Sequence, residues 1–113
     1  MSKLSKLQPN VRISITNPES ESGSLFGRGV ADLCLGVRST GSLNAAAKGM
    51  GMAYSKAWRI VKDTEEALGV QLLNRDGAHG STLTEEGDRI LDAYNTLDEH
   101  MARAAQKAFE DLI

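Results

Sequence analysis

The sequence predicts a small, mainly helical α+β domain, and three observations support this prediction. From residue 29 onward, apolar residues recur at intervals of three and four, which is the spacing of one helix face. Between residues 70 and 84 this spacing gives way to two short apolar pieces around glycines, a pattern typical of a two-stranded ribbon. A chain of 113 residues can bury one core, which excludes a large multi-part enzyme.

The first 27 residues predict a tail followed by a β-hairpin. Residues 1 to 10 contain no apolar block, so we expect a flexible N-terminus and no secretory signal. Residues 11 to 16, VRISIT, alternate apolar and polar side chains, which predicts a strand with one buried face. A polar run with Pro18 and Gly23 predicts a turn, after which the LFG segment can pair with that strand.

Three helices are predicted between residues 29 and 68. The first ends near Thr40, and its inward face consists of Val30, Leu33, Cys34 and Val37. Ser42 can cap the second helix, which ends at Gly51. The third runs from about Ala53 to Leu68 before Gly69, with Ala57, Ile60, Val61, Thr64 and Leu68 facing inward. The single cysteine excludes an intramolecular disulfide and is expected to be a buried thiol.

The second and third helices have the steric pattern of a helix-turn-helix. Two helices joined by a tight turn can cross steeply only where the contact residues are small, and small residues stand at Ala46, Ala47, Gly51 and Ala57. Larger side chains, Met50, Met52 and Ile60, are expected to fill the wedge between the helices. The third helix should then protrude, with Trp58 packed against Tyr54 and Val61 and with polar side chains facing outward.

The last third of the chain predicts a ribbon and one long helix. Thr84 can cap this helix, and Gly87 in its first turn is expected to cost a little stability. Apolar residues then alternate at intervals of four and three, the period of a helix seam. We expect this seam to pack on a second copy, the alternative being that the helix folds back on its own core. The seam comprises Ile90, Tyr94, Leu97, Met101, Ala104 and Ala108.

Charge is divided unevenly along the chain. Residues 1 to 62 contain nine Lys or Arg and three Asp or Glu, whereas residues 63 to 113 contain four and twelve. The net charge is −2, which by itself argues against a polyanionic partner, yet the basic half indicates one surface made for phosphates. Arg, Lys and hydroxyl side chains on a protruding helix suit the major groove of DNA.

Three ordered motifs carry a resemblance to a known family. GSLNAAAK, GMAYSKAWRIV and LTEEGDRILDAY, within about residues 11 to 97, resemble the N-terminal DNA-binding domain of the molybdate-responsive (ModE-like) regulators, a LysR-type winged helix-turn-helix. The resemblance implies a winged helix-turn-helix domain over 11 to 84, with an N-terminal hairpin, and a dimerisation helix over 85 to 113. Ala53 stands where the family has serine. The family's molybdate-binding domain has no counterpart, so no molybdate site is expected in this chain.

The leading hypothesis is a cytoplasmic, homodimeric transcriptional regulator that reads an inverted repeat in double-stranded DNA. Its recognition helix would cover about residues 53 to 68 and its wing about 72 to 84. The candidate DNA-binding residues are Ser42, Asn44, Tyr54, Ser55, Lys56, Arg59, Lys62, Arg75, His79, Ser81 and Thr82. The alternative is a winged-helix protein-interaction module that docks through the acidic last helix. No catalytic constellation, cofactor motif, membrane span or metal site is predicted, since His79 and His100 lack a second ligand at useful spacing.

Overall fold

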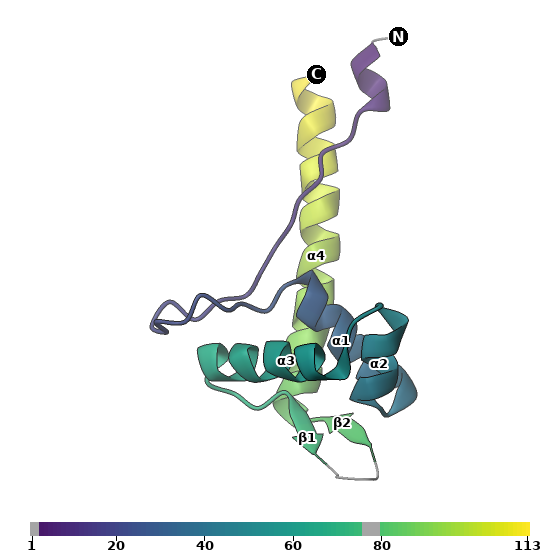
Figure 1. The fold of residues 1–113 in the computed structure, drawn as a ribbon. Coiled ribbons are helices and arrows are strands. Elements are labelled where there is room, and N and C mark those ends of the chain that lie inside the picture. Colours follow the sequence, from purple (N-terminus) through teal and green to yellow (C-terminus); the bar gives the residue numbers. More distant parts are fainter. Residues whose placement is uncertain (1–2, 76–79) are drawn as a thin grey trace.

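The chain forms a helical head built on one long helix. The computed structural model describes residues 3–75 and 80–113. Its elements are a 3-10 helix Lys3–Lys6, α1 Arg28–Thr40, α2 Leu43–Gly49, α3 Tyr54–Leu68, β1 Leu73–Arg75, β2 Ser81–Leu83 and α4 Glu85–Leu112. Figure 1 shows α1, α2 and α3 gathered around the first part of α4, the ribbon at the same end, and both termini at the other end. The predicted fold class is confirmed.

The core lies between α1, α2, α3 and the first turns of α4. The helical spacing predicted for α1 is confirmed, because Leu33, Cys34 and Val37 are almost fully buried. The predicted cap of α2 is also confirmed, since the Ser42 hydroxyl accepts from the Ala45 amide at 3.1 Å. α1 and α2 approach closely at Gly36, where a Cβ would lie 2.6 Å from the Cβ of Ala46. The close approach of α1 to α2 therefore depends on a small residue at each of these two positions.

The predicted N-terminal hairpin is reduced to one pair of residues. Ile15 and Phe26 exchange two backbone hydrogen bonds of 2.9 Å, which confirms the pairing of VRISIT with LFG. No regular strand forms over residues 11 to 16, so that part of the prediction is wrong. The reason is the register: with Ile15 opposite Phe26, residues 11 to 14 would have to pair with residues 27 to 30, and these residues begin α1.

The ribbon is fastened to the head at its base. β1 and β2 pair antiparallel with Leu73 opposite Leu83. A carboxylate oxygen of Glu65 on α3 accepts from the amides of Leu72 and Leu73 at 2.7 and 3.2 Å. On the other strand, the Ser81 amide donates to the Gly41 carbonyl at 2.9 Å. These bonds hold the ribbon beside α3, where a wing is expected.

α4 is partly docked and partly exposed. Thr84 caps it as predicted, accepting from the Gly87 amide at 2.9 Å. Tyr94 is 2% exposed and packs edge-on against Phe26, so its prediction as a seam residue for a second copy is wrong; Ile90 also packs against the chain's own core. Leu97 and Met101 are 44% and 42% exposed. Among the described helices, none combines the length and the apolar character needed to cross a membrane.

Candidate nucleic-acid interface

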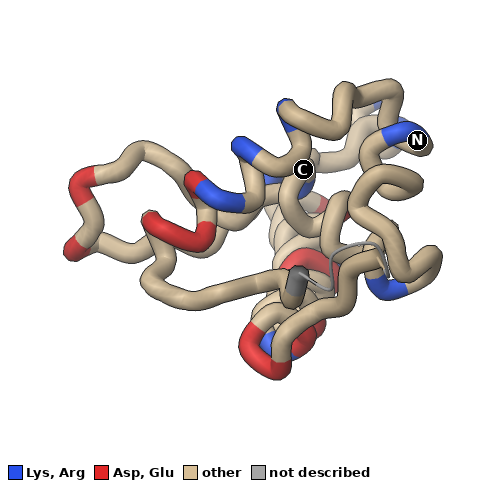
Figure 2. Tube along the Cα trace, turned by 60° about the horizontal axis from the view of Figure 1, so that its bottom comes forward, with Lys and Arg blue, Asp and Glu red and all other residues tan. Residues whose placement is uncertain are grey.

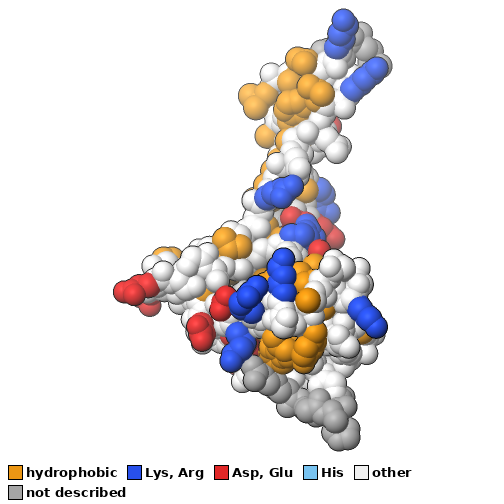
Figure 3. All heavy atoms as spheres, in the orientation of Figure 1, with side chains coloured by type: hydrophobic (Ala, Val, Ile, Leu, Met, Phe, Trp, Pro, Cys, Tyr) orange, Lys and Arg blue, Asp and Glu red, His pale blue; other side chains and the backbone are white. Residues whose placement is uncertain are grey.

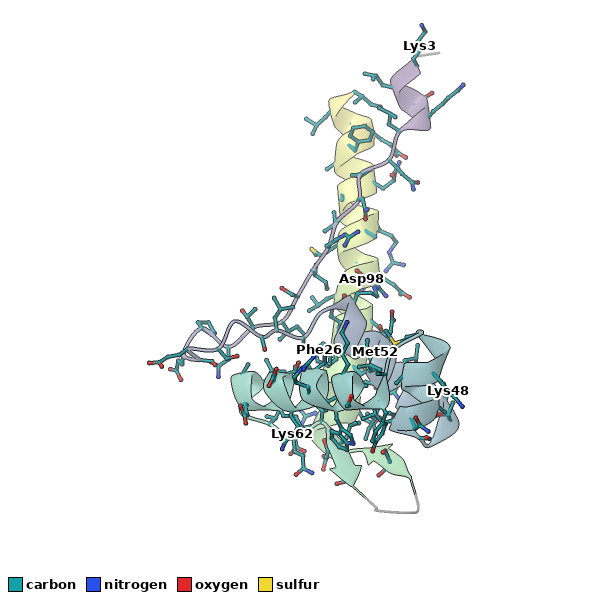
Figure 4. All side chains as sticks on the ribbon, in the orientation of Figure 1. Lys3, Phe26, Lys48, Met52, Lys62 and Asp98 are labelled. Carbon is teal, nitrogen blue, oxygen red and sulfur yellow. The ribbon has the colours of Figure 1, made fainter. Side chains whose placement is uncertain are left out.

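The turn between α2 and α3 is closed by backbone hydrogen bonds. The Ala47 carbonyl accepts from the amides of Met50 and Met52 at 3.0 and 2.9 Å, and Gly51 adopts a φ of 66°. Met52 packs against the core as predicted, and Figure 4 labels it at the helical head. Met50 is 38% exposed, so the prediction that it fills the wedge is wrong. Ile60, the third large side chain predicted for the wedge, packs against the core as expected.

α3 has one buried and one exposed face. Ala57, Val61, Thr64 and Ala67 are buried, whereas the predicted contact residues Ser55, Lys56, Arg59 and Lys62 are exposed and Tyr54 is 46% exposed. Figure 3 shows a group of Lys and Arg side chains over α3, and Figure 2 shows Asp and Glu on the same helix as well as in the loop after residue 16 and at the start of α4. Asp63 and Glu66 are exposed beyond Lys62, so the outer face of α3 is basic only from Lys56 to Lys62.

The start of α3 is suited to an anion. Its N-cap is Ala53, and no side chain caps the first-turn amides. Helix N-termini carry partial positive charge and unpaired amides, which favour phosphate groups. The loss of the family's serine at position 53 thus leaves the helix start uncapped, directly beside Tyr54 and Ser55.

Tyr54 and Trp58 form a pair on the exposed side of α3. The Trp58 Nε1–H donates to the Tyr54 hydroxyl oxygen at 2.6 Å, and the two rings meet edge-on with centroids 6.4 Å apart. Trp58 packs against the core, whereas Tyr54 is largely exposed. These contacts confirm the predicted packing of Trp58 against Tyr54. The hydroxyl oxygen accepts from Trp58, and a tyrosine hydroxyl that accepts one hydrogen bond can still donate its own proton to another acceptor.

We expect Trp58→Phe and Tyr54→Phe each to weaken DNA binding by about 2- to 10-fold, the value of one hydrogen bond of ~0.5–1.5 kcal/mol. Trp58→Phe removes the donor but keeps an aromatic ring in the core. The double variant should lose no more than either single one, because both changes break the same chain of hydrogen bonds. Fluorescence anisotropy titrations at fixed salt measure this. Losses that add up, or no loss, would contradict the assigned role of the pair.

The remaining predicted contact residues differ in availability. Asn44 is exposed on α2, while the hydroxyl of Ser42 is engaged in the cap of that helix. In the ribbon, Thr82 is exposed and accepts from the Asn74 amide group at 3.3 Å, whereas Ser81 is only 8% exposed and offers a duplex little surface. The side chain of Arg75 and all of His79 lie outside the described residues.

Sequence reasoning missed Glu65, which fixes the ribbon to α3, because its partners are backbone amides and leave no motif. Over residues 3–75 and 80–113, no group of three His, Cys, Asp or Glu side chains is arranged to hold a metal ion. His100 is exposed on α4.

Comparison with known proteins agrees with this geometry. The chain is 34% identical over 80 residues to the transcriptional regulator ModE of Yersinia pestis and 44% identical over 68 residues to the HTH-type transcriptional regulator CrgA of Neisseria meningitidis serogroup C (strain 8013). These matches cover 67% and 60% of this chain but only 29% and 22% of the relatives, so the chain spans less than a third of their length.

Solved structures of the same kind share the fold. The DNA-binding domain of CbnR in its DNA complex superposes with a TM-score of 0.62 at 25% identity, covering 75% of this chain and 97% of that domain. CbnR, a LysR family transcriptional regulator, gives a TM-score of 0.57 at 26% identity over 71% of this chain and 27% of its own. The profile described as "Bacterial regulatory helix-turn-helix protein, lysR family" matches residues 32–88. The chain belongs to the LysR family of bacterial regulatory helix-turn-helix proteins.

Proposed function

We propose that this chain is the DNA-reading part of a cytoplasmic, ModE-like transcriptional regulator that binds an inverted repeat as a homodimer. The observation that carries the proposal is the outer face of α3, where Lys56, Arg59 and Lys62 are exposed on the second helix of a helix-turn-helix. Arg and Lys in this position can donate to base edges and phosphates of the major groove. The uncapped start of α3 adds backbone donors for a phosphate.

The relatives support this role. CbnR's DNA-binding domain was solved as a DNA complex, and both curated relatives are named transcriptional regulators. Similarity to ModE of Yersinia pestis supports a regulator of the ModE-like kind. The basic outer face of α3 from Lys56 to Lys62 is the feature that this chain would use for the same task.

The experiment that tests DNA contact needs no known operator. Affinity for a mixed-sequence duplex is measured as salt is varied, and log K should fall linearly with log salt by about 0.9 for each phosphate contacted. Lys62→Ala should reduce this slope by about one. Lys107→Ala, on the far part of α4, is the matched control and should leave the slope unchanged. Binding that is absent at low salt, or equal effects of the two variants, would contradict the proposal.

The proposed dimer uses the outer part of the α4 seam. Leu97, Met101, Ala104 and Ala108 are exposed and lie on one face of the helix. The N-terminal segment covers the opposite face, where Leu7 lines a 340 Å³ cavity with Gln106 and Phe109. The chain's own N-terminal segment therefore leaves the seam uncovered. A second copy of the chain fits this seam, because it presents an identical row of apolar residues with the same spacing.

We expect Met101→Asp to convert the dimer to monomer and to leave the head folded, because Met101 is exposed and outside the core. A carboxylate in an apolar seam would have to lose its hydration, or the seam would have to open. Ala102→Asp adds the same charge on a different face of α4 and should leave the dimer intact. Sedimentation velocity measures both variants. A dimer that survives Met101→Asp would place the interface elsewhere.

A further inference from the structure

α4 is buried against the rest of the chain only near its beginning. Its buried residues are Gly87, Leu91 and Tyr94, and no residue of α4 beyond Tyr94 is buried. The part from residue 95 to 112 extends about 27 Å at ~1.5 Å per residue. The direction of this part depends on how the first turns are held, because a small rotation there is amplified along the helix.

Arg38, in the last turn of α1, contacts two carboxylates of α4. Its Nη2 and Nε lie 2.9 and 3.2 Å from Oδ1 of Asp88, and its Nη1 lies 3.0 Å from Oδ1 of Asp92. The two carboxylates are one turn apart on α4. A planar guanidinium that spans both of them fixes the distance between the helices and also the rotation of α4 about its axis.

Arg28, in the first turn of α1, contacts α4 further along. Its Nη2 lies 2.6 Å from Oδ2 of Asp98, and its guanidinium carbon lies 5.6 Å from the centre of the Tyr94 ring. Figure 4 labels Asp98 on α4 close to where α1 begins. The pairing order is antiparallel, because the start of α1 contacts the later residue of α4 and the end of α1 contacts the earlier ones.

The contacts of Arg28 and Arg38 at opposite ends of α1 together determine the direction of the α4 axis relative to α1. A single contact would leave α4 free to pivot about it. Arg28 and Arg38 are ten positions apart, or ~15 Å along a helix. If α4 tilted by ~10° about Leu91, Met101 in the seam would move by ~3 Å, which is about one base-pair step of ~3.4 Å. The same tilt in the second copy would add to this displacement.

We propose that Arg28 and Arg38 are positioning residues that fix the direction of α4 relative to α3 and thereby select the separation of the two half-sites in the operator. The half-site part of this inference rests on the dimeric, DNA-binding function proposed above. The ion pairs are exposed, with side-chain exposures of 60% and 26% for Arg28 and Asp98 and of 36% and 52% for Arg38 and Asp88. Exposed pairs contribute little to stability, so their loss should alter geometry and leave the head folded.

The test measures the direction of α4 without DNA. Spin labels are attached to Glu66→Cys on α3 and Lys107→Cys on α4, and pulsed electron paramagnetic resonance gives the distance distribution in labelled chain diluted with unlabelled chain. The native thiol does not interfere, because burial raises the pKa of Cys34 to about 12 and hides the sulfur from the reagent. Arg103→Ala, which removes one positive charge from the exposed part of α4, is the matched control.

Arg38→Ala and Arg28→Ala should each shift or broaden the distribution by ~3 Å or more, the displacement expected for a ~10° tilt. Arg38→Lys keeps the positive charge but loses the planar guanidinium that spans both carboxylates. Its distance distribution should therefore lie between those of wild type and Arg38→Ala. Arg28→Asp alone should broaden the distribution, and the exchanged pair Arg28→Asp with Asp98→Arg should restore it. Unchanged distributions in both alanine variants would overturn the proposal, whatever the result of the DNA experiments.

A second readout concerns the half-sites themselves. On inverted repeats whose separation is changed one base pair at a time, wild type should prefer one separation, and the alanine variants should lose this preference while binding a single half-site as before. Equal preferences in wild type and variants would overturn the assignment of spacing to these arginines. Absence of any half-site binding by wild type would instead reject the proposed function and leave the distance measurement as the test of the two arginines.

Discussion

Arg59→Ala should lower the affinity for the operator by about 10- to 100-fold, or ~1.4–2.8 kcal/mol, at fixed salt. Arg59 is exposed in the second turn of α3, where a side chain can reach base edges once the helix enters the major groove. An arginine guanidinium that donates two hydrogen bonds to guanine contributes both to affinity and to sequence preference. The variant should therefore also relax the preference for one base in each half-site. Lys56→Ala should weaken binding as well, and the dimer should persist in both variants.

The matched control is Arg103→Ala, which removes the same charge from α4 away from α3. Titrations of wild type and variants on one duplex, and on duplexes substituted at each base, separate the loss of affinity from the loss of preference. If Arg103→Ala weakened binding as much as Arg59→Ala, the effect would reflect net charge alone. If Arg59→Ala bound like wild type, α3 would not be the recognition helix as assigned.

Gly87→Ala should destabilise the head by ~1–3 kcal/mol, although glycine to alanine in a helix normally stabilises by up to ~1 kcal/mol. A Cβ at position 87 would collide with the carbonyl oxygen of Leu72 and lie 3.1 Å from the Thr84 hydroxyl. The Leu72 carbonyl accepts from the Thr84 amide at 2.9 Å, so moving it would break the junction between the ribbon and α4. The atom in the way is backbone and cannot rotate aside.

Gly29→Ala provides the control, because Gly29 also lies in the first turn of a helix and a Cβ there would meet nothing within 4 Å. That substitution should be neutral or stabilising. Urea unfolding followed by circular dichroism gives both free energies, with equal slopes expected for the two variants. A Gly87→Ala variant as stable as wild type would contradict the close packing of α4 on the ribbon.

Features determined by neighbouring residues were predictable from the sequence. In the caps at Ser42 and Thr84, the hydroxyl oxygen accepts a hydrogen bond from the backbone amide three residues further along the chain. The exposed and buried faces of α3 follow from helical period alone, and so does the exposure of Lys56 and Arg59. These are the features that carry the candidate interface, so a candidate interface could be predicted from the sequence.

Features that depend on distant residues were not predictable. Tyr94 shares the period of Leu97 and Met101, but the arrival of Phe26 from the N-terminal segment places it in the chain's own core. Gly87 was expected to cost α4 a little stability. Its close packing against the Leu72 carbonyl could not be foreseen, because Leu72 comes from the segment that leads into the ribbon. The contacts of Arg38 with α4 join residues fifty positions apart, and nothing in the spacing of either helix signals them.

Specific DNA reading is tested by selecting bound duplexes from a random DNA pool at near-physiological salt and sequencing them. We expect enrichment of an inverted repeat whose half-sites lie about one helical turn apart, as required by two recognition helices related by a two-fold axis. Failure to enrich any sequence, with the protein folded and dimeric, would contradict specific DNA reading and would favour a protein-interaction module.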